Sequence, residues 1–199
     1  GVAWTWEPRR RQYYLHNFLS SQPQLNFHNP QAYAAQLDTL RFWLDRGVDG
    51  FRMHVINLIS KHPDLPDGVV ADGALWGDGF PYYAGGPRIH EFLAEMHREV
   101  FEGRDRVYLT VGEMPGVTID EARLFTDPAR RELDMVFQFE HVGLDHGPEG
   151  KWGMQRLDVR ALKRSLAAWQ NGLSAVGWNS LYWNNHDQPR VVSRFGDDG

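Results

Sequence analysis

Two acidic residues follow apolar stretches that could form buried strands, and they could carry out acid–base chemistry there. Glu113 comes directly after residues 107–112, and Asp187 comes after His186 at the end of another apolar segment. Two carboxyl groups facing one cleft suit cleavage of a glycosidic bond, because one can be kept protonated while the other stays charged. Each acid could instead cap a following helix or pair with an arginine, and position alone leaves both possibilities open.

A second group of polar residues lies in the stretch 47–61, GVDGFRMHVINLISK. A short apolar run between turn signals is typical of a strand buried on both faces. Arg52, His54 and Asn57 are the polar residues at its carboxyl end. Because side chains alternate along a strand, we expect Arg52 and His54 to point into the same space.

The elements that must position these residues alternate between strand and helix. A helix is expected to begin at Asn29-Pro30, with Asn29 as the N-cap, and to end before Gly47. The other predicted elements are strands at 51–56, 107–113, 134–140 and 179–183, and helices at 88–101, from Thr118 onward, and at 159–173. Residues 1–28 and 62–87 are expected to be loops. Such alternation predicts parallel strands with right-handed crossovers.

Two α/β architectures fit this order. A doubly wound sheet usually shows a glycine-rich phosphate loop after a strand, and the sequence contains none. The predicted strands end instead in His54, Glu113, Glu140 and Asp187, and functional side chains at the ends of several strands are typical of a (β/α)₈ barrel. Such a barrel needs about 250 residues, so we expect a partial barrel, and both ends of the chain are interpreted as cut.

The composition excludes several function classes. The net charge is −5 without clustering, there is no cysteine, and no apolar run is long enough to span a membrane. Neither nucleic acid nor a membrane is expected as a partner. No metal or cofactor is expected either, since Ala94 stands where a zinc helix starting at His90 would need its second histidine. The abundant aromatic residues could form the core or stack on sugars. In the absence of a signal peptide, a cytoplasmic protein is expected.

Three segments resemble sequence blocks of the α-amylase superfamily of glycoside hydrolases, in the same order: GVDGFRMxVIN, VGEMPG and NNHDQPRVVSRFG. The segment 22–26, QPQLN, resembles a fourth block, which is usually QPDLN. Within that superfamily the blocks are most similar to oligo-1,6-glucosidases, with dextran glucosidases and trehalose-6-phosphate hydrolases as near relatives. The resemblance covers residues 1–199 and implies the central part of the catalytic barrel, about strands 4 to 7. The rest of the barrel, an inserted second domain and a C-terminal β domain would lie outside the chain.

The resemblance implies a retaining α-glucosidase with a role for each matching position. The residue at position 54 attacks the anomeric carbon, and Glu113 protonates the leaving oxygen and then activates water. Asp187, helped by His186, stabilises the oxocarbenium-like transition state. Arg52 orients and charge-stabilises the nucleophile.

The same resemblance assigns substrate binding to the neighbouring positions. Gln188 and Arg190 join Arg52 and His186 in this group. Val55 matches a position that tends to be Val in α-1,6-acting members and Thr in α-1,4-acting ones. The expected substrate is therefore a short oligosaccharide with a terminal α-1,6-linked glucose. Trehalose 6-phosphate and α-1,4-linked glucosides remain the alternatives, and the oligomeric state is not predicted.

The chain departs from the family pattern at two positions. His54 stands where the family has Asp, and Gln24 stands where it usually has Asp. An imidazole cannot form the hydrolysable glycosyl ester that a carboxylate forms. We therefore expect little or no retaining hydrolysis by the chain as written. His54 could be a sequence error, a deliberate substitution or the mark of a natural inactive relative that binds sugar or serves as a partner subunit.

Overall fold

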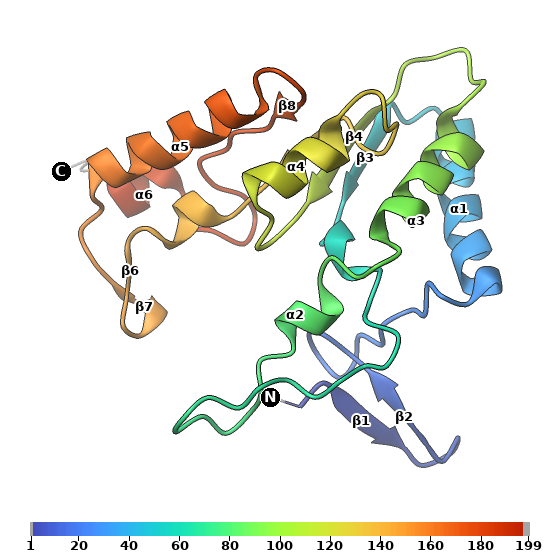
Figure 1. Cartoon of the computed structure of the whole chain (residues 1–199), viewed down its shortest axis with the longest axis horizontal. Coiled ribbons are helices and arrows are strands. Elements are labelled where there is room, and N and C mark those ends of the chain that lie inside the picture. The colour runs from blue at the N-terminus through green and yellow to red at the C-terminus, as the bar shows by residue number, and fades with distance from the viewer. Residues whose placement is uncertain (1, 197–199) are drawn as a thin grey trace. The chain divides into compact units, whose positions relative to one another are not determined.

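The computed structural model describes residues 2–196, which form two compact units. One unit contains the residues up to Gly47 together with Asn57–Phe92, and the other contains Val48–Ile56 together with the residues from Leu93 onward. The candidate residues at positions 52–55, 113 and 186–190 all belong to the second unit. Figure 1 shows the course of the chain through its helices and strands.

The first unit begins with a hairpin that the sequence analysis did not predict. β1 (Trp4–Glu7) and β2 (Gln12–Leu15) pair antiparallel, with Trp6 opposite Tyr13. The two rings meet edge to face with centroids 5.0 Å apart, and aromatic cross-strand pairs of this kind stabilise hairpins. The expectation of a loop throughout residues 1–28 was therefore wrong for this part.

Helix α1 (Pro30–Asp45) confirms the predicted start and end of the first helix. The Asn29 side chain accepts a hydrogen bond from the backbone N–H of Gln31 at 2.9 Å, which satisfies one of the free N–H groups of the first turn. The hydroxyl of Tyr33 donates to the carbonyl of Phe92 at 2.6 Å. The expected loop 62–87 contains only a short helix, α2 (Phe80–Tyr83), and an isolated bridge between Val69 and Asp78.

The second unit is built on a parallel sheet with strand order β3-β4-β5-β8. These strands are β3 (Gly50–Met53), β4 (Leu109–Glu113), β5 (Met135–Phe137) and β8 (Trp178–Asn179). Every neighbouring pair is parallel, as the alternation predicted, and the strands follow chain order, as in a (β/α)₈ barrel. Each strand is shorter than predicted, and β3 ends at Met53, so His54 and Val55 lie in the turn that follows it.

Helices connect the strands of this sheet. The connection from β3 to β4 includes η1 (Ile56–Leu58) and α3 (Ile89–Met96), which continues as the π-helix η2 (His97–Phe101). α4 (Ile119–Thr126) links β4 to β5 and begins with a capping box between Thr118 and Glu121. α5 (Val159–Leu173) links β5 to β8 and packs against α4 (Figure 1). Trp169 of α5 is 1% exposed and fills the core of this layer.

The segment between β5 and α5 holds more structure than predicted. It contains the turn η3 (Glu140–Gly143) and a small antiparallel hairpin of β6 (His146–Gly147) and β7 (Gly150–Met154). His141 of η3 is buried, with 2% of the residue exposed. A last short helix, α6 (Val191–Phe195), follows the segment that carries Asp187.

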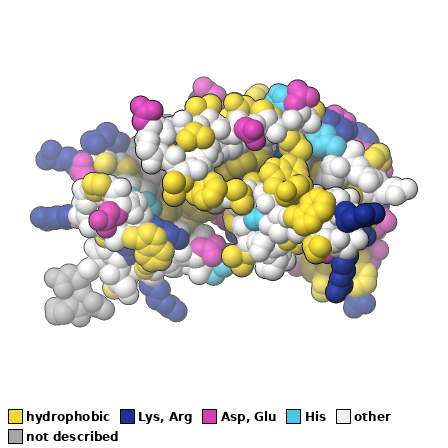
Figure 2. All heavy atoms as spheres, turned by 90° about the horizontal axis from the view of Figure 1, so that it is seen from below, with side chains coloured by type: hydrophobic (Ala, Val, Ile, Leu, Met, Phe, Trp, Pro, Cys, Tyr) yellow, Lys and Arg dark blue, Asp and Glu magenta, His cyan; other side chains and the backbone are white. Residues whose placement is uncertain are grey.

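The sheet does not close into a barrel within residues 2–196, where β3 and β8 are its edges. Several large apolar side chains of the second unit are exposed, among them Val107, Leu109 and Trp178. Figure 2 shows hydrophobic side chains spread over the face it presents. Among the helices in the described part of the chain, none is both long and apolar enough to cross a membrane.

Candidate active site

Glu113 is the centre of the candidate site, and one of its carboxylate oxygens lies within hydrogen-bonding distance of three nitrogen atoms. Oε2 accepts a hydrogen bond from the backbone N–H of Val55 at 2.9 Å and lies 2.8 Å from Nη2 of Arg52. Nδ1 of His54 lies 3.0 Å from the same oxygen. The side chain of Glu113 is only 4% exposed. A buried carboxylate with a charged partner and a backbone N–H is held firmly in one place.

The register of the sheet explains why these groups meet. Met53 pairs with Gly112, so the turn after β3 lies beside the residue that ends β4. Gly112 has no side chain, and a Cβ there would lie 2.7 Å from Cδ1 of Leu133 and 3.0 Å from Cγ2 of Ile56. The backbone just before Glu113 is therefore closely packed.

Val55 contributes its backbone to the site. Its φ angle is +36°, in the left-handed region that β-branched residues rarely adopt. This conformation accompanies the hydrogen bond that the Val55 N–H donates to Glu113. Unfavourable backbone geometry that the surrounding structure maintains is found mainly at functional sites.

The imidazole of His54 stands between two groups with opposite demands. Its Nδ1 lies 3.2 Å from Nη1 of Arg52, which is a donor, and 3.0 Å from Oε2 of Glu113, which is an acceptor. A single ring nitrogen can either donate or accept, so it serves only one of the two at a time. The prediction that Arg52 and His54 share the same space is confirmed, although His54 lies beyond the end of the strand.

An aromatic wall stands next to Glu113. The guanidinium of Arg52 lies 5.6 Å from the ring centroid of Phe137, and the ring of Tyr182 packs against Phe137 at 5.3 Å. His141 meets Tyr182 edge to face at 4.7 Å. The sequence analysis missed Tyr182 and His141 because their roles depend on tertiary contacts alone.

Burial keeps both rings of this pair neutral near pH 7. Burial raises the pKa of the Tyr182 phenol, and the negative charge of Glu113 acts in the same direction. Burial also lowers the pKa of His141, and the positive charge of Arg194 adds to that effect. The wall beside Glu113 is therefore uncharged.

The segment that carries the other predicted residues forms a separate cluster. Nε2 of His186 lies 3.2 Å from Oδ2 of Asp187, and the two side chains are 70% and 58% exposed. The side chain of Gln188 accepts a hydrogen bond from Arg194 at 3.1 Å. Arg190 is exposed and is the N-cap residue of α6. Within residues 2–196, no hydrogen bond or ion pair links Asp187 to Glu113.

A buried ion pair supports this segment, and the sequence analysis did not find it. The side chains of Arg194 and Asp145 are 4% and 2% exposed and form two contacts with each other, one of them at 2.8 Å between Nε and Oδ2. Arg194 belongs to the NNHDQPRVVSRFG block, whereas Asp145 lies in a stretch for which no element was predicted. Nothing in the local sequence indicates that the two residues meet.

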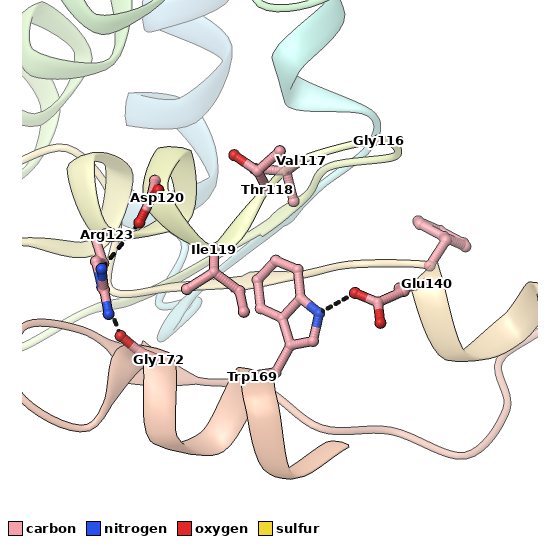
Figure 3. Close-up of a pocket in the computed structure, with 10 residues that line it drawn as sticks. Gly116, Val117, Thr118, Ile119, Asp120, Arg123, Glu140, Trp169 and Gly172 are labelled. Atoms are coloured by element: carbon pink, nitrogen blue, oxygen red, sulfur yellow. Dashed lines mark hydrogen bonds and ion pairs between the residues drawn. The ribbon is translucent and has the colours of Figure 1, made fainter. Parts of the chain in front are cut away.

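A cavity of about 600 Å³ lies beside this region and is lined by none of the predicted site residues. It is formed by the loop after β4, the start of α4, and Glu140 and Trp169 (Figure 3). Nε1 of Trp169 donates to Glu140 at 2.8 Å, and Arg123 bonds both Asp120 and the carbonyl of Gly172. Each charged lining group thus has a hydrogen-bond partner within the lining.

The comparisons with known proteins identify the family. The family model of the alpha-amylase catalytic domain matches residues 1–199. The chain belongs to this family. It is 55% identical over 199 residues to an oligo-1,6-glucosidase of Parageobacillus thermoglucosidasius and 46% identical over 200 residues to a trehalose-6-phosphate hydrolase of Bacillus subtilis (strain 168). All of the chain is covered in both cases, but only 35% and 34% of the two relatives.

Solved structures agree with the family assignment. A trehalose-6-phosphate hydrolase of Bacillus licheniformis matches the whole chain with a TM-score of 0.89 and 46% identity. The isomaltulose synthase from Erwinia rhapontici NX5 matches with a TM-score of 0.88 and 37% identity. The chain covers 35% of each structure. These matches support an α/β fold of the (β/α)₈ type, of which the four-stranded sheet is a part.

Proposed function

We propose that residues 1–199 are the central part of the (β/α)₈ barrel of a retaining α-glucosidase, about strands 4 to 7. The remaining strands, a second domain and a C-terminal β domain would belong to a longer parent protein. The observation that carries the proposal is the arrangement of Arg52, position 54 and the backbone of Val55 around the buried carboxyl group of Glu113. The high identity to oligo-1,6-glucosidases supports it.

In this mechanism Glu113 handles the proton. It protonates the glycosidic oxygen as the bond to the anomeric carbon breaks, and it then removes a proton from the water that hydrolyses the glycosyl-enzyme. Asp187 and His186 stabilise the positive charge that develops on the sugar ring. Arg52 orients position 54, and Gln188 and Arg190 contribute to binding the sugar.

Position 54 is where the covalent bond to the sugar would form. A carboxylate there attacks the anomeric carbon and later leaves as water attacks, whereas His54 cannot form such an ester. Loss of a covalent nucleophile removes transition-state stabilisation of about 4–8 kcal/mol. The chain with His54 is therefore proposed to be inactive or nearly so, while the groups around it keep their places.

For the substrate, we favour a short oligosaccharide that ends in an α-1,6-linked glucose. Val55 supports this choice because α-1,6-acting members of the family tend to have Val at this position, and its backbone N–H donates to Glu113 at 2.9 Å. Relatives named trehalose-6-phosphate hydrolase, 46% and 45% identical, make trehalose 6-phosphate the strongest rival. An α-1,4-linked substrate is the other alternative.

A second candidate function is a relative without catalytic activity that binds sugar or acts as a partner subunit. The observation that favours it is the imidazole of His54, which occupies the place of the nucleophile and contacts Glu113 at 3.0 Å. Such a protein would bind an α-glucoside without turning it over.

The test compares the full-length parent carrying His54 with its His54→Asp variant. Glucose release is followed from isomaltose, maltose and trehalose 6-phosphate. We expect the His54→Asp variant to be faster by a factor of about 10³ or more, and to prefer isomaltose. If both proteins are folded and inactive but bind an α-glucoside, the second candidate function replaces the first. Comparable turnover by the protein carrying His54 would show that the nucleophile is assigned to the wrong position.

A further inference from the structure

The guanidinium of Arg194 makes contacts in two directions. Toward the segment after β5, it bonds both carboxylate oxygens of Asp145 and donates to the carbonyl of Val142 at 2.6 Å. Toward the segment before α6, its Nη1 donates to the side-chain carbonyl of Gln188 at 3.1 Å. One buried side chain therefore joins two segments that lie far apart in the sequence, around Asp145 and around Gln188.

Gln188 is the residue next to Asp187, so this contact reaches the candidate stabiliser of the transition state. Two further hydrogen bonds at Asp187 and Gln188 are local to the segment. The backbone N–H of Asp187 donates to the side chain of Asn185 at 2.9 Å, and that of Gln188 donates to the carbonyl of Asn185 at 3.3 Å. These local bonds shape the loop, and Arg194 connects it to the buried Asp145.

Stability alone does not account well for a buried ion pair. Removing two charges from water costs several kcal/mol per ion, and well-packed apolar residues of similar size are often equally or more stabilising. The planar guanidinium of Arg194 has hydrogen-bond donors in fixed directions. With partners on both sides, it fixes the distance and orientation of the two segments, which a flexible or apolar contact would not do. The geometry of Arg194 fits the task of holding a loop in register.

We propose that Asp145 and Arg194 are a positioning pair that holds Asp187 in place for the reaction. This inference rests on the proposed function. Neither residue touches the substrate; Arg194 acts through Gln188 and the loop, and Asp145 acts by fixing Arg194. Because a displacement of about 1 Å in an active site can cost about 10²-fold in rate, loss of the pair affects kcat far more than KM.

The experiment uses the full-length parent in the His54→Asp form and three changes at the pair: Arg194→Lys, Asp145→Asn, and the double variant Asp145→Leu with Arg194→Met. Lysine keeps the charge but lacks the guanidinium group that donates to Gln188. The double variant keeps apolar volume in the pocket and should remain folded. We expect kcat to fall about 10- to 100-fold in all three, with KM within about threefold.

Arg130→Lys is the matched control. Arg130 bonds the buried carboxylate of Glu132 at 2.7 Å just before β5, at the end of the strand away from Glu113. This variant should lose thermal stability as Arg194→Lys does but keep kcat within about twofold. p-Nitrophenyl α-glucoside has a leaving group that needs little protonation. Because Asp187 is proposed to act on the sugar ring, Arg194→Lys should lower kcat on this substrate as much as on isomaltose.

A binding measurement keeps the inference testable if the His54→Asp protein shows no turnover. 1-Deoxynojirimycin carries a positive charge like that of the transition state, and its binding to the folded His54 parent can be measured by calorimetry. Variants of the pair should weaken this binding at least about tenfold, and Arg130→Lys should not. If the double variant is stable and retains both kcat and inhibitor binding, the positioning role is overturned. If the His54→Asp protein is inactive but inhibitor binding still depends on Arg194, the proposed reaction is rejected and the positioning role is kept.

Discussion

In this structure Arg52 bonds Glu113 directly, at 2.8 Å, and the imidazole of His54 lies beside both. A carboxylate at position 54 would give Arg52 a second anionic partner and would compete with Glu113 for the guanidinium. The substitution therefore affects two groups at once. Under the proposed mechanism, His54 removes the nucleophile, and it leaves Glu113 as the carboxylate that Arg52 contacts among the described residues.

The proposed role of Glu113 as proton donor leads to a prediction about leaving groups. In the His54→Asp protein, Glu113→Gln should lower kcat on isomaltose by about 10²- to 10⁴-fold, because an amide cannot transfer the proton. With p-nitrophenyl α-glucoside the formation of the glycosyl-enzyme should be affected much less. Pre-steady-state release of p-nitrophenol measures that step. An equal loss on both substrates would argue that Glu113 supports the structure and not proton transfer.

Lys61 gives a prediction about pH. Burial lowers the pKa of Lys61 from 10.5 to about 8 in the folded chain. Between these values the unfolded chain binds a proton that the folded chain does not, so this group makes the free energy of unfolding rise with pH from about 8 to about 10.5. Below pH 8 both states are protonated and the burial penalty is constant.

Lys61→Met should therefore stabilise the full-length parent at pH 7 and flatten the rise between pH 8 and 10. Urea unfolding at several pH values measures both effects. Lys163→Met, on the exposed surface of α5, is the control and should leave the pH dependence unchanged. If the free energy of unfolding rises with pH equally in the Lys61→Met protein and the parent, Lys61 is not the group that causes the rise.

At the scale of elements, the contact between the turn after β3 and the end of β4 depends on Gly112. Gly112→Ala would place a Cβ 2.7 Å from Leu133 and 3.0 Å from Ile56. We expect a loss of about 1–3 kcal/mol in the free energy of unfolding, together with lower kcat in the His54→Asp protein, since Glu113 is displaced. Gly143→Ala is the control, because its Cβ would meet nothing closer than 3.9 Å. Normal kcat in the Gly112→Ala protein would show that the site tolerates movement of β4.

Elements with a local signal were predicted well from the sequence. The Asn29 cap, the helix start at Thr118 and the parallel pairing of the four strands were all predicted from patterns in the local sequence, and the structure confirms them. The grouping of Arg52, His54 and Glu113 also follows, because neighbouring parallel strands end at the same edge of a sheet.

The missed features have causes that a single segment does not reveal. The hairpin of β1 and β2 depends on cross-strand partners such as Trp6 and Tyr13. The strands are shorter than predicted because apolar residues continue past the last ladder hydrogen bond, as at Val55. The pair of Asp145 and Arg194 is set by tertiary packing, so neither residue could be recognised beforehand.

At the scale of the whole molecule, the described chain exposes apolar side chains and open sheet edges. Val107 is 97% exposed and Trp178 is 60% exposed, and the sheet ends at β3 on one side and β8 on the other. Unpaired edges and apolar patches of this kind promote aggregation. We expect the isolated 199-residue chain to be insoluble or molten. A cooperative thermal transition in calorimetry of the isolated chain would refute this.

The order of the main sheet also has a consequence for synthesis on the ribosome. Each strand pairs with the strand that precedes it in the sheet, from β3 to β4, β5 and β8. A nascent chain therefore finds the partner of every newly emerged strand already outside the exit tunnel, and the sheet can grow by one strand at a time. Translation supplies residues at about 5–20 per second, far more slowly than loops close. Growth of this sheet should thus keep pace with translation and need no segment that has yet to be made.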